Sequence, residues 1–410
     1  MSDPWATISH ALRQLEAGDT LMIADGDYDE PESIVRLRNS GSGEAPITVR
    51  GSQRPEGAKP GVSWKFAKIE MRALDVSHWA FEGICFRPRE VAFHLGDAKQ
   101  KTKATHIRFR RCRFEGRQGL KIGRAEDVVV EDCHFYRIQS ERIGEDMHGI
   151  AAQHYAHRLT VRGCRFEDIS GDGIQVGHSE GDLRDIVIEN CRFWINRNPD
   201  GTLVDQDLQE QWGNTGENGI DVKEVDPGGS VTIQNCEISG YRPTVPGQNA
   251  SGAFGAGIVV HFGSRNVVVA RCRLSDNSQG ITVGGVRKGG GPPAEVRIEN
   301  CLIHDNLEVG LSLREWVGCS LFTTLLSATA WTTRGASTRW GSSAAGVSRR
   351  ERIYGSARMP MGLRSSTICS GLVSGWRGRG KGVAGSLRIT IAGRPSISRC
   401  ARSQWGAMRW

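Results

Sequence analysis

The sequence predicts an all-β chain folded as a parallel β-helix, and two recurring phrases predict it. The first phrase alternates apolar and polar residues and reaches a cysteine; its clearest copies are residues 161–166, 188–193 and 298–303. The second phrase is close to Gly-Ile-x-Val and begins at Gly173, Gly219, Gly257 and Gly280. Repeats spaced by roughly 20 to 45 residues are typical of stacked architectures. Because each unit reads strand, gap, strand, we expect a solenoid of parallel strands.

The N-terminal residues predict a cap for this stack. Residues 7–15 fit a short amphipathic helix, whose apolar positions are Ile8, Leu12 and Leu15. Residues 18–21 then form a turn into a first strand. An end coil of a solenoid exposes unpaired backbone and apolar core, so a capping helix placed there covers both. Coils are expected from about residue 47 to residue 313.

The cysteines fit a buried ladder better than disulfides or a metal site. Seven of the eleven occupy one register of the repeat, namely Cys112, Cys133, Cys164, Cys191, Cys236, Cys272 and Cys301. Aligning Phe81 with Phe109 puts Ile84, and not Cys85, in the same slot. A slot that accepts Ile or Cys holds a small apolar group. Metal-binding CxxC spacing is absent from the sequence.

The composition changes after residue 314, so we divide the chain into a β-helix domain, 1–314, and a tail, 315–410. The tail holds 15 of the 53 Lys and Arg but 2 of the 46 Asp and Glu, which leaves the first 314 residues mildly acidic. We interpret the tail as a basic, low-order segment. Its Arg, Gly, Ser and Trp are typical of an out-of-frame read of a GC-rich gene; a basic tail for a polyanionic partner is the alternative.

Several partners and compartments are disfavoured by the sequence. The acidic body shows no cluster of Lys and Arg of the kind that nucleic acid requires. No apolar run reaches 18 residues, and no signal peptide precedes the helix. We therefore expect a monomer that binds neither nucleic acid nor membrane. We expect a cytoplasmic protein if the given sequence begins at the natural start, and a secreted or periplasmic protein if the natural N-terminus has been truncated.

Titratable residues converge on one face when the Gly-Ile-x-Val strands are stacked in register. Alternate side chains of a strand point to opposite faces, so the first, third and fifth places are expected to face solvent. The fifth place reads Gln153, Gly177, Lys223, His261 and Gly284. The third place reads Ala151, Gln175, Asp221, Val259 and Thr282, and the place before the glycine reads His148, Asp172, Asn218 and Ala256. Long insertions, 194–218 and 241–256, precede the strands of Lys223 and His261.

Three further phrases give the chain a family resemblance. They are Gly18-Asp19-Thr20-Leu21, Ala45-Pro46-Ile47-Thr48-Val49 and Phe81-Glu82-Gly83-Ile84. With the cysteine coils, they make residues 5–314 resemble the right-handed parallel β-helix proteins of the pectate-lyase-like superfamily. The resemblance implies a lyase that cleaves an acidic, uronate-containing polysaccharide by β-elimination.

Residue roles follow from this resemblance and from position on the face. Lys223 would be the base if its pKa were lowered, and His261 an acid, a base or a sugar contact. The resemblance also implies Ca²⁺, with Asp221, Glu217 and Glu224 as oxygen ligands. Substrate contacts are assigned to His148, Asp172, Gln175, Gln153 and Arg242.

Other readings of the same residues stay open. A glycoside hydrolase would need paired carboxylates, for which Asp172, Asp221 and the 145–146 pair are candidates. An epimerase or a non-catalytic carbohydrate-binding β-helix would use the same fold. Asp221 and Lys223 would otherwise form a simple surface pair, and His261 would stack on a neighbouring coil. Asp205, Asp207 and Glu210 lie in an insertion that either binds calcium or is merely solvated.

Overall fold

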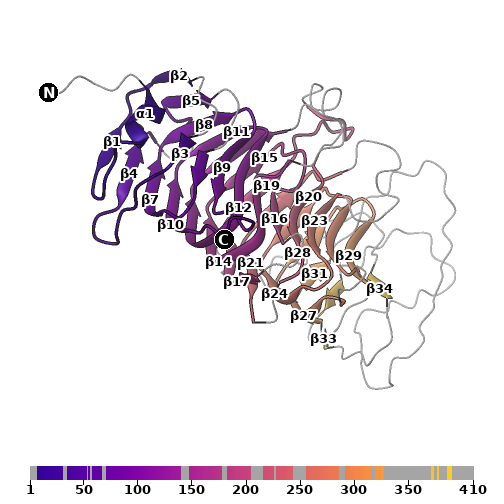
Figure 1. Ribbon diagram of the computed structural model, residues 1–410. Coiled ribbons are helices and arrows are strands. Elements are labelled where there is room, and N and C mark those ends of the chain that lie inside the picture. The colour runs from indigo at the N-terminus through magenta and orange to yellow at the C-terminus, as the bar shows by residue number, and fades with distance from the viewer. Residues whose placement is uncertain are drawn as a thin grey trace, which may run out of the picture.

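The protein is an elongated solenoid of stacked parallel strands, shown in Figure 1. The computed structural model describes residues 7–30, 35–52, 54–55, 58–66, 71–139, 147–177, 182–204, 216–225, 228–242, 255–285, 291–314, 319–322, 324–326, 371–373, 376–377 and 386–389. Each strand pairs in parallel with the equivalent strand of the next coil, so the predicted β-helix is confirmed.

Each coil contributes strands to three faces. The first face holds β3 (Val35–Arg36), β6 (Met71–Ala73), β9 (Val91–Leu95), the start of β12 (Gln118–Glu131), the start of β14 (Ile150–Arg162), β16 (Ile174–Val176), β20 (Asn218–Val222), β23 (Ala256–Val260), β26 (Gln279–Val283) and β29 (Val309–Arg314). The second face holds β1 (Thr20–Met22), β4 (Ile47–Arg50), β7 (Ser77–Glu82), β10 (Ala104–Arg110), the ends of β12 and β14, β17 (Asp182–Arg184), β18 (Ile186–Glu189), β21 (Val231–Gln234), β24 (Arg265–Ala270), β27 (Ala294–Glu299) and β30 (Ser320–Phe322).

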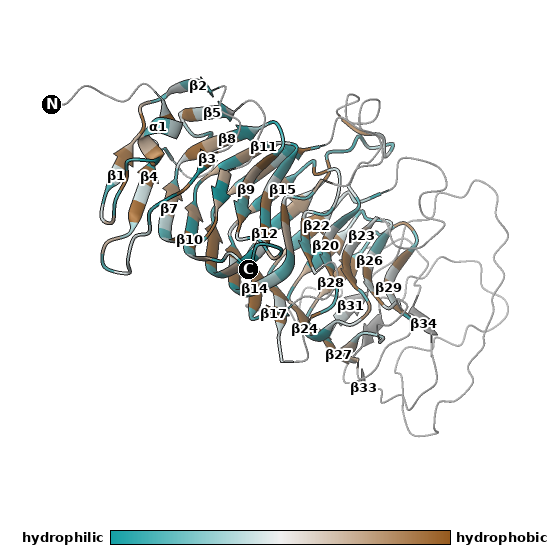
Figure 2. Ribbon diagram, in the orientation of Figure 1, coloured by the Kyte–Doolittle hydropathy of each residue, from teal (hydrophilic) through white to brown (hydrophobic). Residues whose placement is uncertain are grey.

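The third face is a separate sheet. It holds β2 (Gly26–Glu30), β5 (Val62–Phe66), β8 (Ile84–Pro88), β11 (Arg113–Gly116), β13 (His134–Ile138), β15 (Arg165–Glu167), β19 (Arg192–Trp194), β22 (Glu237–Ser239), β25 (Arg273–Ser275), β28 (Leu302–His304), β31 (Thr324–Leu326) and β32 (Gly371–Val373). Hydrophobic and hydrophilic residues alternate along many strands in Figure 2, as expected when one side of each strand is buried.

A tight corner joins the second face to the third and explains the cysteine phrase. One residue there adopts the left-handed conformation, with φ between 50° and 64°, in the coils of Gly83, Arg111, Asp132, Gly163, Asn190, Asn235, Arg271 and Asn300. Gly and Asn tolerate this conformation better than other residues, which is why they recur before the cysteine. We call this turn the second corner.

The core consists of columns of identical or similar side chains. Along the third face, the rings of Phe114, Phe135, Phe166 and Phe193 stack with centroids 4.5 to 4.7 Å apart. All nine cysteines of the described residues are buried and free. Phe109 pairs with Phe81, which places Ile84 beside Cys112 as the sequence predicted. The thiols of the seven cysteines in the predicted register each approach a backbone carbonyl oxygen, so the ladder is a packing feature.

The N-terminal cap is present but shorter than predicted. Helix α1 spans Ile8–Leu12, and the side chain of Thr7 accepts a hydrogen bond from the backbone N–H of His10. Buried Glu30 accepts hydrogen bonds from the first backbone N–H groups of the helix. These contacts fix the helix over the first coil. No helix of the described residues is long and apolar enough to span a membrane.

The stack continues past the predicted domain boundary. Strands β30 and β31 pair in parallel with β27 and β28, which adds part of a coil after residue 314. Three short strands, β32, β33 (Trp376–Arg377) and β34 (Ser386–Ile389), then pair antiparallel with β31, β30 and β29. Leu311 and Leu313 are buried in the last complete coil.

Candidate active site

The register of the first face brings the predicted site residues together. Gln175 pairs with Asp221, Asp221 with Val259, and Val259 with Thr282, so the third-place column is as expected. The backbone N–H of Lys223 bonds to Val176, and that of His261 bonds to Val222. Lys223 and His261 therefore occupy equivalent fifth places on adjacent coils.

The third-place column is buried, which corrects the expectation that it faces solvent. Gln175 and Thr282 are 5% and 6% exposed, and Asp221 is fully buried. The side chains of Lys223 and His261, in the fifth place of the same coils, lie against Asp221 and help to enclose it. Asp221 and Lys223 form a pair as one reading expected, but the pair is not a surface one.

Asp221 stands between two basic groups. Nζ of Lys223 lies 2.7 Å from Oδ2, and Nε2 of His261 lies 3.6 Å from Oδ1. Neither oxygen accepts a hydrogen bond of good geometry from the described residues, even at the short distance to Lys223. The contact of Asp221 with Lys223 is therefore chiefly an ion pair.

The surroundings of Lys223 hold it in its charged form. Burial acts to lower the pKa of Lys223, but attraction from Asp221, followed by Asp172 and Glu217, outweighs burial and raises the pKa above its ordinary value. The sequence-based hypothesis of a lysine base required a lowered pKa. In this structure the ammonium is instead a fixed cation, with 18% of its side chain exposed.

Asp172 forms a second, fully satisfied polar centre on the preceding coil. Its carboxylate accepts hydrogen bonds from Nδ2 of Asn218 at 3.0 Å and from Nε2 of Gln175 at 3.3 Å. Its backbone N–H donates to Nδ1 of His148 at 3.0 Å, and the two side chains are 3.6 Å apart. Because Asp172 and Asn218 are fully buried, this centre orders the strands beneath the site.

Glycines flank the part-buried residues Lys223 and His261 in the fifth place. Gly177 precedes Lys223, and Gly284 follows His261 along the stack. A side chain at Gly177 would meet the carbonyl oxygen of Lys223 at 1.8 Å, and one at Gly284 would meet that of Arg314 at 2.1 Å. Both also have positive φ, so glycine is required at each place. Lys223 and His261 thus project between positions without side chains.

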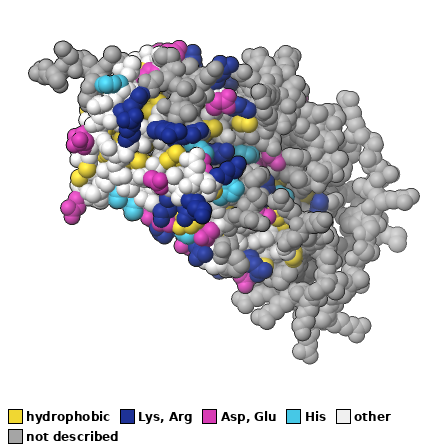
Figure 3. Space-filling model, in the orientation of Figure 1, with side chains coloured by type: hydrophobic (Ala, Val, Ile, Leu, Met, Phe, Trp, Pro, Cys, Tyr) yellow, Lys and Arg dark blue, Asp and Glu magenta, His cyan; other side chains and the backbone are white. Residues whose placement is uncertain are grey.

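A column of cations on the same face was missed by sequence reasoning. Arg36 pairs with Arg72, Arg72 with His94, and His94 with Lys121, after which the column runs through Ala151 to Gln175 and Asp221. Neighbouring strands are about 4.8 Å apart, so these side chains follow one another closely. Figure 3 shows Lys and Arg gathered with His over the N-terminal coils. We call Arg36, Arg72 and Lys121, together with His94, the cation column.

The predicted calcium ligands do not form a site. Among the described residues, no group of three or more His, Cys, Asp or Glu is placed to hold a metal ion. Glu217 contributes to the field at Lys223, whereas Glu224 adopts φ 49° at the following turn and bonds through its backbone to Phe262. Of the three predicted ligands, Asp221 is the one whose buried oxygens lack a hydrogen-bond donor, and one carboxylate is too few ligands for Ca²⁺. These residues do not fit a calcium centre.

Of the remaining predicted contacts, Gln153 lies in the fifth-place column two coils before Lys223, with Gly177 between them. Gln153 is part-buried on β14, and Arg242 forms an ion pair with Asp276 beyond the third face. Burial lowers the pKa of Arg242. Asp205, Asp207, Glu210 and the 145–146 pair lie outside the described residues.

Comparisons with known proteins agree with this architecture. The family described as "Right handed beta helix region" matches residues 74–207 and 209–322, more than half of the chain. A search of curated proteins finds no relative. The PL6 family alginate lyase AlyGC superposes with a TM-score of 0.50 at 14% identity, covering 74% of this chain and 39% of that one. This chain thus spans about two fifths of that lyase.

Two further solved structures are similar at a lower level. A rhamnogalacturonan lyase superposes with a TM-score of 0.49 at 13% identity, covering 75% of this chain and 78% of that one. The mannuronan C-5 epimerase AlgE6 A-module of Azotobacter vinelandii gives 0.47 at 15% identity, covering 72% and 71%. At 14% identity, the likeness to AlyGC establishes a shared fold alone.

Proposed function

The chain belongs to the right-handed β-helix family, and from that premise we propose that it cleaves an acidic polysaccharide by β-elimination. The polymer would lie along the first face, across the strands. The reacting sugar would sit beside Lys223 and His261, and the chain would extend over the cation column toward the N-terminus.

The cation column is the observation that carries this proposal. A uronate polymer bears a carboxylate on each sugar, and a row of basic side chains about 4.8 Å apart offers repeated counter-charges. One register column contains Arg36, Arg72 and Lys121 and continues along the stack to Asp221. Lys223 and His261 lie beside Asp221 at that end of the column. Since residues 1–314 are acidic overall, this row is a local feature of the first face.

His261 and Lys223 have different proposed roles: His261 removes the proton, and Lys223 neutralises the substrate carboxylate. In β-elimination a base removes the proton on the carbon next to the carboxylate, the electron pair forms a carbon–carbon double bond, and the glycosidic oxygen leaves with its electrons. A protonated Lys223 suits the neutralisation of the substrate carboxylate, because its pKa is raised. His261, whose Nε2 lies 3.6 Å from Asp221, would take the proton.

A hydrolase is less well supported by the same residues. Asp172 and Asp221 are both fully buried, and Asp172 is saturated by hydrogen bonds from Asn218 and Gln175. A glycosidase needs two carboxyl groups that reach opposite sides of one glycosidic bond. An epimerase would share the proton removal but return a proton to the carbon instead of breaking the chain.

Ultraviolet absorbance of unsaturated uronates tests the proposal. The full chain would be offered alginate, pectate and a glycosaminoglycan, and a rise in absorbance on one polymer is expected. His261→Ala should abolish the rise, whereas His304→Ala, a histidine of the third face, should retain it. Absence of a rise on every polymer, in a sample with the circular dichroism of strands, would reject the lyase.

A further inference from the structure

His261 has its two ring nitrogens in different surroundings. Nε2 lies 3.6 Å from Oδ1 of Asp221, which is fully buried. Nδ1 faces Gly285: a Cβ built on that glycine would meet Nδ1 at 3.4 Å and no other heavy atom of the described residues within 4 Å. The backbone favours glycine there as well, because φ is 98°. One nitrogen therefore faces a carboxylate, and the other faces a position without a side chain.

Lys223 determines which oxygen of Asp221 faces the imidazole. Its Nζ lies 2.7 Å from Oδ2, which leaves Oδ1 on the side of His261. An N–H bond directed at a buried anion is attracted to it, whereas a lone pair directed at the same anion is repelled. In a neutral imidazole one nitrogen carries the hydrogen and the other keeps a lone pair. The carboxylate therefore favours the form with the hydrogen on Nε2 and the lone pair on Nδ1.

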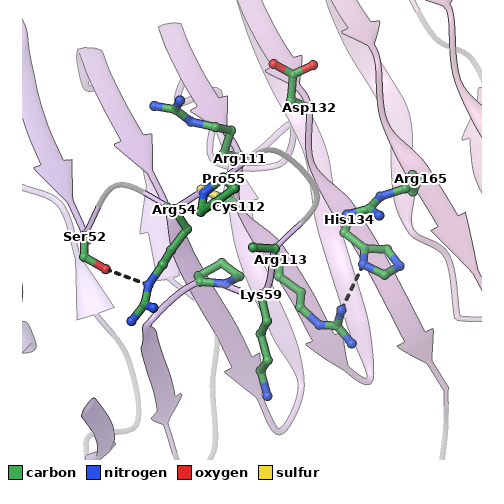
Figure 4. Close-up of a pocket in the computed structure, with 13 residues that line it drawn as sticks. Ser52, Arg54, Pro55, Lys59, Arg111, Cys112, Arg113, Asp132, His134 and Arg165 are labelled. Atoms are coloured by element: carbon green, nitrogen blue, oxygen red, sulfur yellow. Dashed lines mark hydrogen bonds between the residues drawn. The ribbon is translucent and has the colours of Figure 1, made fainter. Parts of the chain in front are cut away.

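His134 shows a contrasting arrangement, in which both ring nitrogens are occupied. Nη1 of Arg113 donates to its Nδ1 at 2.9 Å, the dashed line in Figure 4, and Nε2 lies 2.9 Å from Glu167. Burial lowers the pKa of His134, which keeps the ring neutral with its hydrogen on Nε2. His261 shares the carboxylate at Nε2, but its Nδ1 is left for a substrate.

From these contacts we propose that Asp221 is a positioning residue for His261. It keeps the ring hydrogen on Nε2, and Nδ1 is the atom that removes the proton from the substrate. The inference rests on the proposed function, since it assigns the reacting atom of the base. Gly285 leaves space beside Nδ1 for the carbon that carries the proton.

The step conserves atoms and electrons. The lone pair of Nδ1 takes the proton from the carbon next to the carboxylate, and the electrons of the C–H bond form the carbon–carbon double bond. The bond to the glycosidic oxygen breaks, and that oxygen leaves with the bonding electrons. The imidazole then carries hydrogen on both nitrogens, and Asp221 stabilises the positive charge that has developed. Transfer of the new proton from Nδ1 to the departing oxygen restores the base.

Nitrogen NMR of the full chain tests the position of the ring hydrogen without any substrate. Histidine is labelled with heavy nitrogen, and spectra are recorded at about pH 8, above the ordinary histidine pKa of about 6.5. The signal of His261 is assigned by its loss in His261→Gln, and His134 provides the reference for hydrogen on Nε2. The same form is expected for His261, and hydrogen on Nδ1 overturns the proposal.

Asp221→Asn should move the ring hydrogen to Nδ1. Attraction to Lys223 turns the amide oxygen toward the ammonium, so the NH₂ group faces Nε2, which must then accept. Lys223 keeps the attraction of Asp172 and Glu217, so the variant should fold. Circular dichroism checks the fold, and a hydrogen that stays on Nε2 in the folded variant overturns the proposal.

Activity tests the role of Nδ1. Because Nδ1 then carries the hydrogen, Asp221→Asn should lower kcat by at least about a hundredfold, the lower end of what a general base contributes. Asp182→Asn is the matched control, because Asp182 lies 3.0 Å from Nε2 of His157 on the second face. This control should leave kcat unchanged, and a full kcat in Asp221→Asn overturns the positioning role.

The outcomes separate this inference from the proposed function. A parent protein that forms no unsaturated product rejects lyase activity, and with it the role of Nδ1, whatever the position of the ring hydrogen. An active parent in which Asp221→Asn and Asp182→Asn lose equal activity keeps the lyase and rejects the specific action of Asp221 on His261.

Discussion

Lys223 and Asp221 form an ion pair whose acid is fully buried, and this burial shapes both stability and chemistry. A carboxylate removed from water needs a counter-charge, because the cost of desolvation is otherwise unpaid. Lys223 supplies that charge and keeps its own proton as a result. The pair explains why a lysine on this face acts better as a fixed cation than as a base.

Removing the lysine alone should therefore destabilise the protein. Lys223→Ala leaves Asp221 without a counter-charge, and we expect a loss of about 3 kcal/mol in the free energy of unfolding. The double variant with Asp221→Asn should recover most of that loss. Urea unfolding measures both, and Lys65→Ala on the third face, 58% exposed, is the control. Equal losses in the single and double variants would contradict the pairing.

The cysteine ladder should be chemically inert in the folded protein. Burial raises the pKa of Cys133, Cys164 and Cys236 well above the ordinary value, so little thiolate forms. Iodoacetamide at mildly alkaline pH should leave the peptides of these cysteines unlabelled until urea is added. Mass spectrometry of the digested protein gives the answer, and labelling of Cys164 without urea would show that the coils open readily.

At the scale of the strand, sequence periodicity predicts position well and depth poorly. The period of two placed Asp221, Lys223 and His261 on one face, and the register confirms their columns. The burial of Asp221 depends on how closely the side chains of Lys223 and His261 cover it. The alternation of residue types along a strand does not encode that contact. The solvent-facing expectation for Asp221 failed for this reason.

The cation column was missed because the N-terminal coils lack the Gly-Ile-x-Val phrase. The first face there carries four triplets, residues 35–37, 71–73, 93–95 and 120–122, each with a basic residue between two apolar ones. That triplet is a weak signal alone and becomes informative when four copies are stacked. A search for apolar-basic-apolar triplets at coil spacing would have found the column.

Neutralising the column should weaken substrate binding more than catalysis. Lys121→Gln is expected to raise KM up to about fivefold with kcat nearly unchanged, because a partly exposed charge contributes at most about 1 kcal/mol. Arg108→Gln, an exposed arginine on β10 of the second face, is the matched control. Steady-state kinetics on the cleaved polymer measures both variants. An equal rise in KM for the two would contradict specific binding of the polymer along the cation column.

A polar ladder on the second face, formed by the hydrogen-bonded side chains of Lys103, Glu126 and Tyr155, predicts how stability depends on pH. Hydrogen bonds from Tyr155 and Lys103 lower the pKa of Glu126 to about 2. Burial and the same contact raise the pKa of Tyr155 to about 12. Stabilisation by Glu126 is therefore complete above its unfolded pKa, about 4.3, and disappears toward pH 2, whereas stabilisation by Tyr155 disappears as pH rises from about 10 to 12.

Urea midpoints across pH test this ladder. Glu126→Gln should show a smaller loss of stability than the parent between about pH 4.3 and pH 2, because it carries no carboxylate to protonate. Its loss above about pH 10 should also shrink, since Tyr155 no longer faces a negative partner. Parallel acid profiles for the two proteins would mean that Glu126 is not paired in solution.

At the scale of the whole molecule, the sequence repeat made the fold predictable, whereas the irregular segments limited what could be predicted about the candidate site. Stacked cysteines, Phe columns and left-handed corners each follow from residues visible in the sequence, such as Asn190 and Cys191. Insertions between coils, such as residues 194–218 and 241–256, carry no repeat, so the sequence gives no prediction of what they build. Strands β30 and β31 also extend the stack beyond residue 314, where the repeat was expected to end.

The charge distribution of the molecule fits a polymer laid along the first face. The cation column occupies the N-terminal coils, and Lys223 and His261 follow on the middle coils. Binding would therefore place one end of the polymer over basic groups and the reacting sugar beside Asp221.

The mass of the products tests elimination most directly. The full chain is incubated with the polymer in water labelled with heavy oxygen, and the fragments are analysed by mass spectrometry. Elimination predicts two fragments whose masses sum to that of the substrate without the gain of a water molecule, one of them carrying the new carbon–carbon double bond. Fragments that together gain one molecule of labelled water would identify hydrolysis and contradict the proposed action of His261 and Lys223.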